Sequence, residues 1–116
     1  MCGICGWWEE RNAGRTEPLT AMLRQMIPRG PDDEGWMEFS LRSGGCLRLG
    51  ARRLAIQDLS LAGHQPMKDP HSGSWLVFNG EIFNFKELRR ELEAHGHQFR
   101  SNGDTEVLLA GYREWG

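Results

Sequence analysis

Apolar residues recur at helical spacing in one stretch near the start of the chain. They occupy positions i, i+3, i+4, i+7 and i+8, namely Leu19, Met22, Leu23, Met26 and Ile27. This spacing predicts an amphipathic helix whose five apolar side chains belong to the core. Thr16 is the expected N-cap, and Pro18 lies in the first turn. Pro28 ends the helix, because proline cannot continue it.

Residues 3–8 predict a short, glycine-rich strand that is buried, and alternation of apolar and polar residues predicts two further strands over 36–41 and 46–56. Residues 29–35 form a loop dense in turn formers and charge. Ser43-Gly44-Gly45 joins the second and third strands as a hairpin. Arg52 and Arg53 must then face opposite sides of their strand. An inward arginine would need an anionic partner.

The second half of the chain begins with a long loop over residues 58–73, which contains His64 and His71. A loop histidine is usually exposed or hydrogen-bonded, and contact with a substrate is the alternative for each of them. After the loop we expect a buried strand over 74–79 and then a tight turn with left-handed backbone at Asn79-Gly80. A helix follows, capped by Asn84 and Glu87 and ending at His95-Gly96. A short strand near 98–99 and a last helix that begins within 101–106 complete the order. The order predicts a mixed α and β fold with antiparallel strands.

Composition narrows the class of protein. The 116 residues allow at most one domain, and the formal charge of −2 makes nucleic acid an unexpected partner. No apolar run approaches the length of a membrane span, and no secretory signal opens the chain. Three cysteines cannot all pair within the chain. Their odd number, without a signal peptide, predicts free thiols in a reducing, cytoplasmic compartment.

Cys2 is the first candidate for chemistry. Removal of Met1 would place a thiol and a free α-amino group on the same residue, and that amine has a reference pKa of about 7.7–8.0. It could therefore serve as the base for the thiol. The plain alternative is a half-buried strand cysteine. Cys2 and Cys5 also have the C-x-x-C spacing of redox or zinc motifs, although a structural zinc site wants four Cys or His ligands.

Several segments, in order along the whole chain, resemble one family. They are Met1-Cys2-Gly3-Ile4, Arg29-Gly30-Pro31-Asp32, residues 53–58 (RLAIQD), His64-Gln65-Pro66, residues 79–84 (NGEIFN) and residues 101–106 (SNGDTE). Each segment alone is weak evidence for a family, but the whole set in this order is specific. The chain resembles the N-terminal glutaminase domain of glutamine-hydrolysing asparagine synthetases, which is a class II glutamine amidotransferase. Pro31 and the Glu81-Ile82 pair distinguish it from hexosamine-6-phosphate synthases and the purine-pathway amidotransferase.

The resemblance implies an α+β fold, the N-terminal nucleophile hydrolase αββα four-layer sandwich with antiparallel sheets. Residues 2–116 would be the N-terminal portion of that domain. The rest of the domain and the ATP-using synthetase domain would be missing. Such a half sandwich is expected to expose apolar sheet surface. No cofactor or metal is expected in this domain, whereas ATP and magnesium would belong to the absent synthetase domain.

The resemblance also implies a chemistry: L-glutamine is hydrolysed to glutamate, and the ammonia serves the ATP-dependent amidation of aspartate to asparagine. Cys2 would be the nucleophile and, through its α-amino group, the base. Asn79 and Gly80 would form the oxyanion hole. Arg53 would bind the α-carboxylate, and Glu81 and Asp104 the α-ammonium.

The remaining features receive minor roles. Arg29 to Asp32 would support the site, and Cys5 and Cys46 would be core thiols. The alternatives are a paralogue that amidates another carboxylate, a truncated non-catalytic remnant and a redox or metal module on Cys2 and Cys5. The expected partners are glutamine and the synthetase domain, with neither nucleic acid nor membrane, and the oligomeric state stays open.

Overall fold

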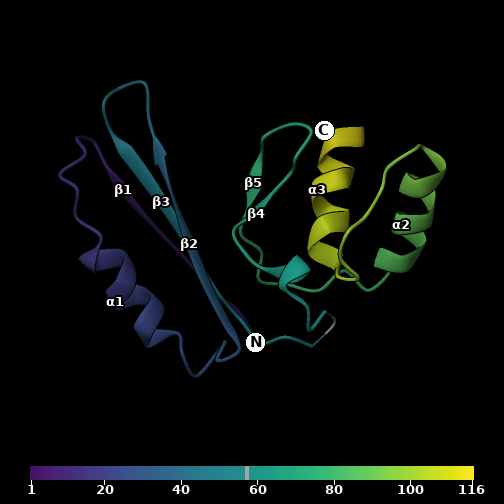
Figure 1. Cartoon of the computed structure of the whole chain (residues 1–116), viewed down its shortest axis with the longest axis horizontal. Coiled ribbons are helices and arrows are strands. Elements are labelled where there is room, and N and C mark those ends of the chain that lie inside the picture. Colours follow the sequence, from purple (N-terminus) through teal and green to yellow (C-terminus); the bar gives the residue numbers. More distant parts are fainter. Residues whose placement is uncertain (57) are drawn as a thin grey trace.

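The first half of the chain forms an antiparallel sheet. A computed structural model describes residues 1–116 with the exception of Gln57. The strands β1 (Gly3–Glu9), β2 (Asp33–Ser40) and β3 (Cys46–Arg53) lie in the order β1-β3-β2, so that β3 is central (Figure 1). The three predicted strands are confirmed, but two of their limits are wrong by three residues. β2 begins three residues earlier than predicted, and β3 ends at Arg53 rather than at Ile56. The predicted burial of the first strand is also wrong, since Ile4 and Trp8 are exposed.

Charge pairing explains why β2 begins within the predicted loop. Asp33 lies opposite Arg53, and Glu34 lies opposite Arg52. Opposite charges that face each other across two strands stabilise the pairing. The two arginines lie on opposite faces of β3, as predicted, and each is partly buried beside an acid of β2. The charged start of β2 is therefore a strand and not a solvated loop.

Helix α1 (Glu17–Gln25) covers one face of this sheet. Leu19 and Leu23 are fully buried against the strands. Gly50 makes this close packing possible, because a Cβ there would lie 3.1 Å from a methyl carbon of Leu23. The predicted helix and its core stripe are confirmed at these two positions, whereas Ile27 lies beyond the helix and is half exposed. Thr16 holds the N-cap position without a side-chain cap bond.

The same face of the sheet carries a buried cation, Arg48 in β3. Its guanidinium donates to Glu9 of β1 at 3.0 Å and to Glu38 of β2 at 2.7 Å, so it links all three strands. Asn12 accepts a further hydrogen bond at 3.1 Å. A buried charge is tolerated when its donors are satisfied in this way.

A second, smaller sheet faces the other side of the first. It consists of β4 (Met67–Lys68) and β5 (Trp75–Leu76), preceded by the short 3-10 helix η1 (Leu61–Gly63). The rings of Phe39 and Trp75 meet edge to face at 5.7 Å between the two sheets. The predicted loop over 58–73 thus contains η1 and β4. The predicted buried strand over 74–79 is wrong in length and in burial, since only two of its residues pair and none is fully buried.

Two helices form the last layer, α2 (Phe85–Ala94) and α3 (Asp104–Trp115). They share a core of Leu92, Val107 and Ala110. Asn84 is the N-cap of α2 as predicted, but the predicted capping-box bond from its side chain is not formed. The strand predicted near 98–99 is also wrong. Phe99 instead packs against this core, with the guanidinium carbon of Arg89 4.7 Å from the centre of its ring.

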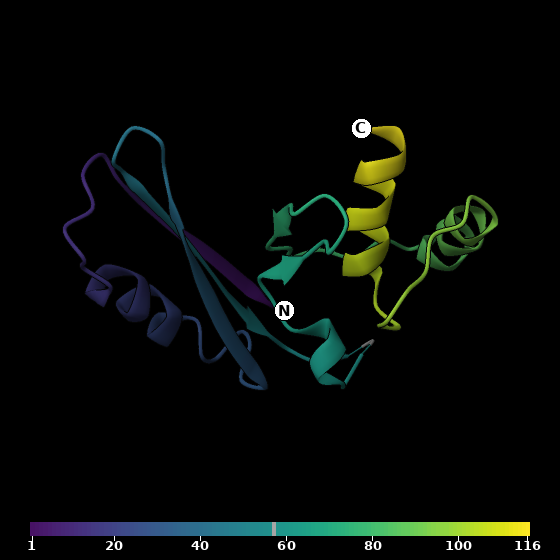
Figure 2. The ribbon, with the colours of Figure 1, turned by 45° about the horizontal axis from the view of Figure 1, so that its top comes forward.

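The layers follow one another as α1, the three-stranded sheet, the two-stranded sheet and the pair of α3 and α2 (Figures 1 and 2). This order of helix, sheet, sheet and helix confirms the predicted α+β class with antiparallel strands. The N-terminus lies where the two halves of the molecule meet (Figure 2). Among the described residues, no helix has the length and apolar character that a bilayer crossing requires.

Candidate active site

A cavity of about 380 Å³ lies between the two halves of the molecule. Its volume falls within the usual range of small-molecule sites. The walls come from the N-terminus, the end of β3, the segment around η1, the segment after β5 and the start of α3. All six residues predicted for the site line this one cavity: Cys2, Arg53, Asn79, Gly80, Glu81 and Asp104.

Cys2 directly precedes β1 and is half buried. Its thiol lies 3.8 Å from the carbonyl oxygen of Leu54, to which it donates weakly. Its own carbonyl accepts a hydrogen bond of 3.2 Å from Nε of Arg29. The backbone of the nucleophile candidate is therefore fixed from the loop that precedes β2.

The loop from Arg29 to Asp32 also holds the end of β3. Asp32 accepts a hydrogen bond of 2.8 Å from the backbone N–H of Ala55. A Cβ at Gly30 would lie 2.7 Å from the carbonyl oxygen of Arg52, so the two backbones approach too closely for any side chain. The loop thus holds both Cys2 and the strand end that carries Arg53.

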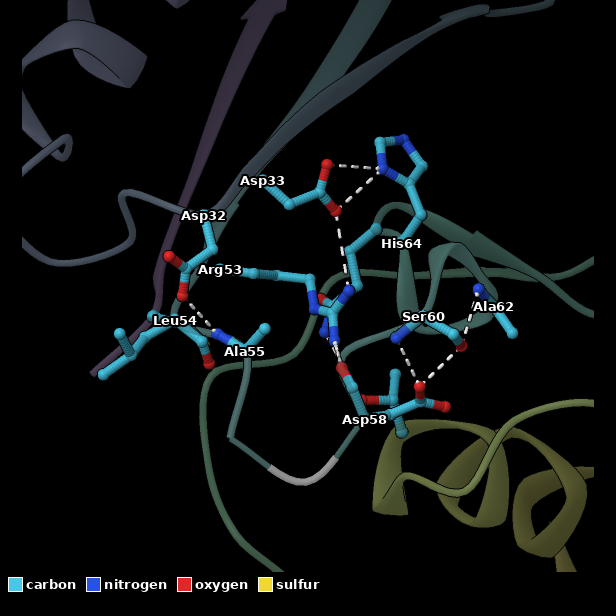
Figure 3. Close-up of polar contacts among 12 residues, drawn as sticks. Asp32, Asp33, Arg53, Leu54, Ala55, Asp58, Ser60, Ala62 and His64 are labelled. Carbon is cyan, nitrogen blue, oxygen red and sulfur yellow. Dashed lines mark hydrogen bonds and ion pairs between the residues drawn. The ribbon is translucent and has the colours of Figure 1, made fainter.

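Arg53 reaches the cavity from the last position of β3 (Figure 3). Its Nη2 donates to the backbone carbonyl of Asp58 at 2.7 Å. Its Nη1 lies 3.6 Å from a carboxylate oxygen of Asp33. The guanidinium lies against Gly63, where a Cβ would come within 2.8 Å of the guanidinium carbon. The cation is thus confined on several sides before any substrate arrives.

The carboxylate of Asp58 joins two walls of the cavity. It accepts hydrogen bonds from the backbone N–H and hydroxyl of Ser60, at 2.8 and 2.5 Å, and from the backbone N–H of Asn102 at 2.8 Å. The hydroxyl of Ser60 and the N–H of Asn102 hold the pKa of this carboxyl below its ordinary value, because they stabilise the charged form. Asp58 therefore remains an anion that ties the segment after β3 to the start of α3.

The acids at the opposite wall differ in exposure. Asp104 is buried at the first residue of α3, and its carboxylate accepts a hydrogen bond of 2.9 Å from the backbone N–H of Ile82. Glu81 is exposed. An acid in the first turn also interacts favourably with the helix dipole.

Asn79 and Gly80 are exposed at the edge of the cavity. The left-handed turn predicted here is wrong, since neither residue has a positive φ. The ring of Phe78 accounts for the glycine instead, because a Cβ at Gly80 would lie 2.8 Å from two of its ring carbons. The close approach of this ring, rather than the backbone angle, leaves little room for a side chain at this position.

Gln65 supports this wall, although no periodic pattern assigned it a role. Its buried side chain accepts a hydrogen bond of 2.7 Å from the backbone N–H of Phe78 and donates to the hydroxyl of Thr105 at 3.3 Å. It thereby fixes the residues beside Asn79 and Asp104. A single polar residue in an irregular loop has no periodic signal, so only its place in the His64-Gln65-Pro66 segment pointed to it.

The remaining cysteines and histidines have other surroundings. Burial raises the pKa of the Cys5 and Cys46 thiols, so both stay protonated near neutral pH and are poor nucleophiles. His64 contacts Asp33, and His71 lies exposed beside a second cavity. The described part of the chain holds no cluster of three or more His, Cys, Asp or Glu side chains arranged for a metal ion.

The cavity therefore combines four chemical functions. Residues that carry a thiol, a side-chain amide, a guanidinium and carboxylates line the same space, and Gly80 adds a backbone N–H beside the amide. A guanidinium and carboxylates suit the two charged ends of a zwitterionic amino acid. A thiol and preorganised N–H donors suit attack on an acyl carbon.

Comparison with known proteins places the chain in context. The family described as "Glutamine amidotransferase domain" matches residues 1–116. A glutamine-hydrolyzing asparagine synthetase of Bacillus subtilis (strain 168) is 39% identical over 119 residues, which cover 99% of this chain and 18% of that protein. One from Arabidopsis thaliana is 35% identical over 119 residues, 100% of this chain and 19% of the relative. The "Amidase chry2" of Gibberella zeae is 31% identical over 128 residues, 100% of this chain and 18% of the relative. The chain thus spans about a fifth of the length of these relatives.

Proposed function

Because the chain belongs to the glutamine amidotransferase domain family, we propose that it hydrolyses the side-chain amide of L-glutamine to glutamate and ammonia, with Cys2 as the nucleophile. The observation that carries the proposal is the common cavity: residues from the N-terminus, from the start of α3 and from three segments between them line one space. No local element would bring them together by itself.

The proposed reaction begins after removal of Met1. The α-amino group of Cys2 accepts the thiol proton, and the sulfur attacks the amide carbon of glutamine. The carbonyl oxygen becomes an oxyanion, which the side-chain amide of Asn79 and the backbone N–H of Gly80 stabilise. One such donor typically contributes about 2.7–4 kcal/mol to lowering the barrier. The intermediate then collapses, and the α-ammonium group returns its proton to the leaving ammonia.

The second half of the reaction releases glutamate. A water molecule gives a proton to the α-amino group and attacks the thioester, and the same N–H donors stabilise the second oxyanion. The carbon–sulfur bond breaks, and the thiol recovers its proton. Arg53 holds the α-carboxylate throughout, while Asp104 and Glu81 bind the α-ammonium. The confinement of Arg53 and the burial of Asp104 favour these assignments, since oriented charges lose little freedom on binding.

The fate of the ammonia depends on sequence outside residues 1–116. We assign ATP-dependent amidation of aspartate to the complete protein, because two of the relatives named above are asparagine synthetases. ATP and Mg²⁺ would be bound by a synthetase domain beyond this chain, and residues 2–116 would be the N-terminal portion of the glutaminase domain. The reaction would take place in the cytoplasm. The amidase among the relatives favours a second candidate, amidation of a different carboxylate.

The experiment uses the complete natural translation product that contains this chain. Cys2→Ala should lower glutamine-dependent asparagine synthesis by roughly 10⁴-fold or more, as the loss of a nucleophile does in other enzymes. Synthesis from ammonia should continue, because it bypasses the thiol. Cys5→Ser is the matched control and should retain both activities. Glutamine-dependent synthesis by the Cys2→Ala variant would contradict the nucleophile. A wild-type protein that releases no glutamate from glutamine would identify a non-catalytic remnant.

A further inference from the structure

The two arginines that end β3 each have an acidic neighbour in β2. The strand register places Glu34 opposite Arg52 and Asp33 opposite Arg53. Because successive side chains alternate, the two pairs lie on opposite faces of the sheet. The Arg52 pair has a short ion contact of 2.9 Å. The Arg53 pair is looser at 3.6 Å. Its arginine lines the cavity, whereas Asp33 does not.

A third residue holds Asp33 in place. Nδ1 of His64 lies 3.0 and 2.9 Å from the two carboxylate oxygens of Asp33. Since a carboxylate can only accept, the imidazole donates its Nδ1–H. Figure 3 shows Asp33 between the ring of His64 and the guanidinium of Arg53. Asp33 and His64 do not line the cavity, and Arg53 is the lining residue whose side chain Asp33 contacts.

Arg53 is thus held from two different segments, by one hydrogen bond and one ion contact. The carbonyl of Asp58 accepts from Nη2 at 2.7 Å, and the carboxylate of Asp33 lies 3.6 Å from Nη1. Contacts at two of its nitrogens orient the plane of the guanidinium. A carboxylate ligand recognises that plane, because the strongest arginine–carboxylate pairs form two parallel hydrogen bonds.

We propose that Asp33, oriented by His64, is a positioning residue that aligns Arg53 for the α-carboxylate of the substrate. The inference rests on the proposed function and deepens it: the pair determines the preference for a free amino acid over an amide without an α-carboxylate. Asp33 also acts electrostatically in the opposite sense, because its charge offsets part of that of Arg53. We expect alignment to dominate, because bidentate binding depends strictly on the orientation of the guanidinium, whereas Arg53 keeps its own positive charge beside Asp33.

The test compares two substrates of the complete natural translation product. L-Glutamine carries the α-carboxylate, and 4-aminobutanamide carries the same amide and an ammonium group without it. Asp33→Asn should lower kcat/KM for L-glutamine about tenfold, mainly through KM, because the guanidinium loses the ion contact that aligns it with the α-carboxylate. For 4-aminobutanamide the change should stay within about twofold, so discrimination between the substrates falls about tenfold.

Two further variants sharpen the test. Glu34→Gln removes the equivalent acid from Arg52 on the other face of the sheet and should leave both substrates unaffected. His64→Ala should lower discrimination in the same direction as Asp33→Asn, whereas His64→Gln keeps a donor and should restore part of it. His64 is half exposed, so these variants address the inference even if Asp33→Asn fails to fold.

Three results would overturn the proposal. An equal loss for both substrates would make Asp33 a general scaffold residue, and a lower KM for L-glutamine would make it a competitor for Arg53. Unchanged discrimination in Asp33→Asn and His64→Ala would remove the role altogether. In each case Cys2-dependent hydrolysis by the wild type would persist. A wild type that hydrolyses neither substrate would instead contradict the proposed function and this inference together.

Discussion

At the scale of the residue, the contact between Gly63 and Arg53 shows how a backbone can hold a charge in place. The guanidinium occupies the space that a side chain at position 63 would need, and its Nη1 lies 3.0 Å from the position that a Cβ there would take. The obstructing group is the end of a flexible side chain. An added methyl group can therefore displace it without disturbing the fold.

Gly63→Ala should consequently separate binding from stability. We expect KM for L-glutamine to rise at least about tenfold, since the displaced guanidinium loses its alignment with the α-carboxylate. The free energy of unfolding should change by less than about 1 kcal/mol. Steady-state kinetics and urea unfolding measure the two quantities. Gly6→Ala is the control, because its Cβ would meet Leu49 at an ordinary distance of 3.5 Å. A large loss of stability with an unchanged KM would contradict this account.

At the scale of the element, Asp58 joins segments that no shared helix or strand connects. Its carboxylate receives hydrogen bonds from Ser60 near η1 and from Asn102 before α3, while its backbone carbonyl receives Arg53. The pKa of this carboxyl is lowered in the folded state. The unfolded chain therefore takes up the proton first as the pH falls.

This linkage predicts the acid stability of the fold. The contribution of Asp58 is complete above its unfolded pKa of about 3.9 and disappears as the pH falls through the lower folded value. Asp58→Asn should cost about 1–3 kcal/mol at pH 7 through its lost hydrogen bonds, and the difference from wild type should shrink between about pH 5 and pH 2. Urea unfolding across this pH range measures the difference in the free energy of unfolding between the variant and the wild type. Glu10→Gln, at an exposed acid, should show no such convergence, and a gap that stays constant with pH would contradict the linkage.

Element by element, periodic patterns were predictable and contacts between distant segments were not. The stripe of α1 and the alternation of β2 and β3 are local signals, and these elements are confirmed. β5 stops early because the N–H of Phe78 bonds to the side chain of Gln65, 13 residues away, and not to a neighbouring strand. The start of β2 depends on its pairing with the end of β3.

The candidate site shows the same difference between features with a local sequence signal and contacts between distant residues. Its six residues were predicted from the ordered segments of the resemblance, and all six line the cavity. The segment from Arg29 to Asp32 was predicted to support the site, and it does hold Cys2 and the end of β3.

Other supporting contacts were missed. Asp33 and His64 are 31 positions apart, and Asp58 and Asn102 are 44 apart. The sequence around each of these four residues does not indicate its distant partner, so these contacts follow only from the assembled fold.

At the scale of the whole molecule, the cavity exists because two layered halves meet at the N-terminus (Figures 1 and 2). One half supplies Cys2 and Arg53, and the other supplies Asn79, Glu81 and Asp104. Met1 also lines the cavity. Any residue before Cys2 therefore occupies part of the space in which we place glutamine and converts the proposed base into a peptide nitrogen.

An N-terminal fusion should for this reason abolish glutamine hydrolysis without unfolding the protein. We expect a fusion whose protease leaves Cys2 as residue one to be inactive with glutamine before cleavage and active after it, because cleavage releases the amine that accepts the thiol proton. Glutamate release, together with the intact mass of the N-terminus, measures the change. The same partner fused at the C-terminus should have no such effect. Equal hydrolysis by the cleaved and uncleaved forms would show that the α-amino group of Cys2 is not the base.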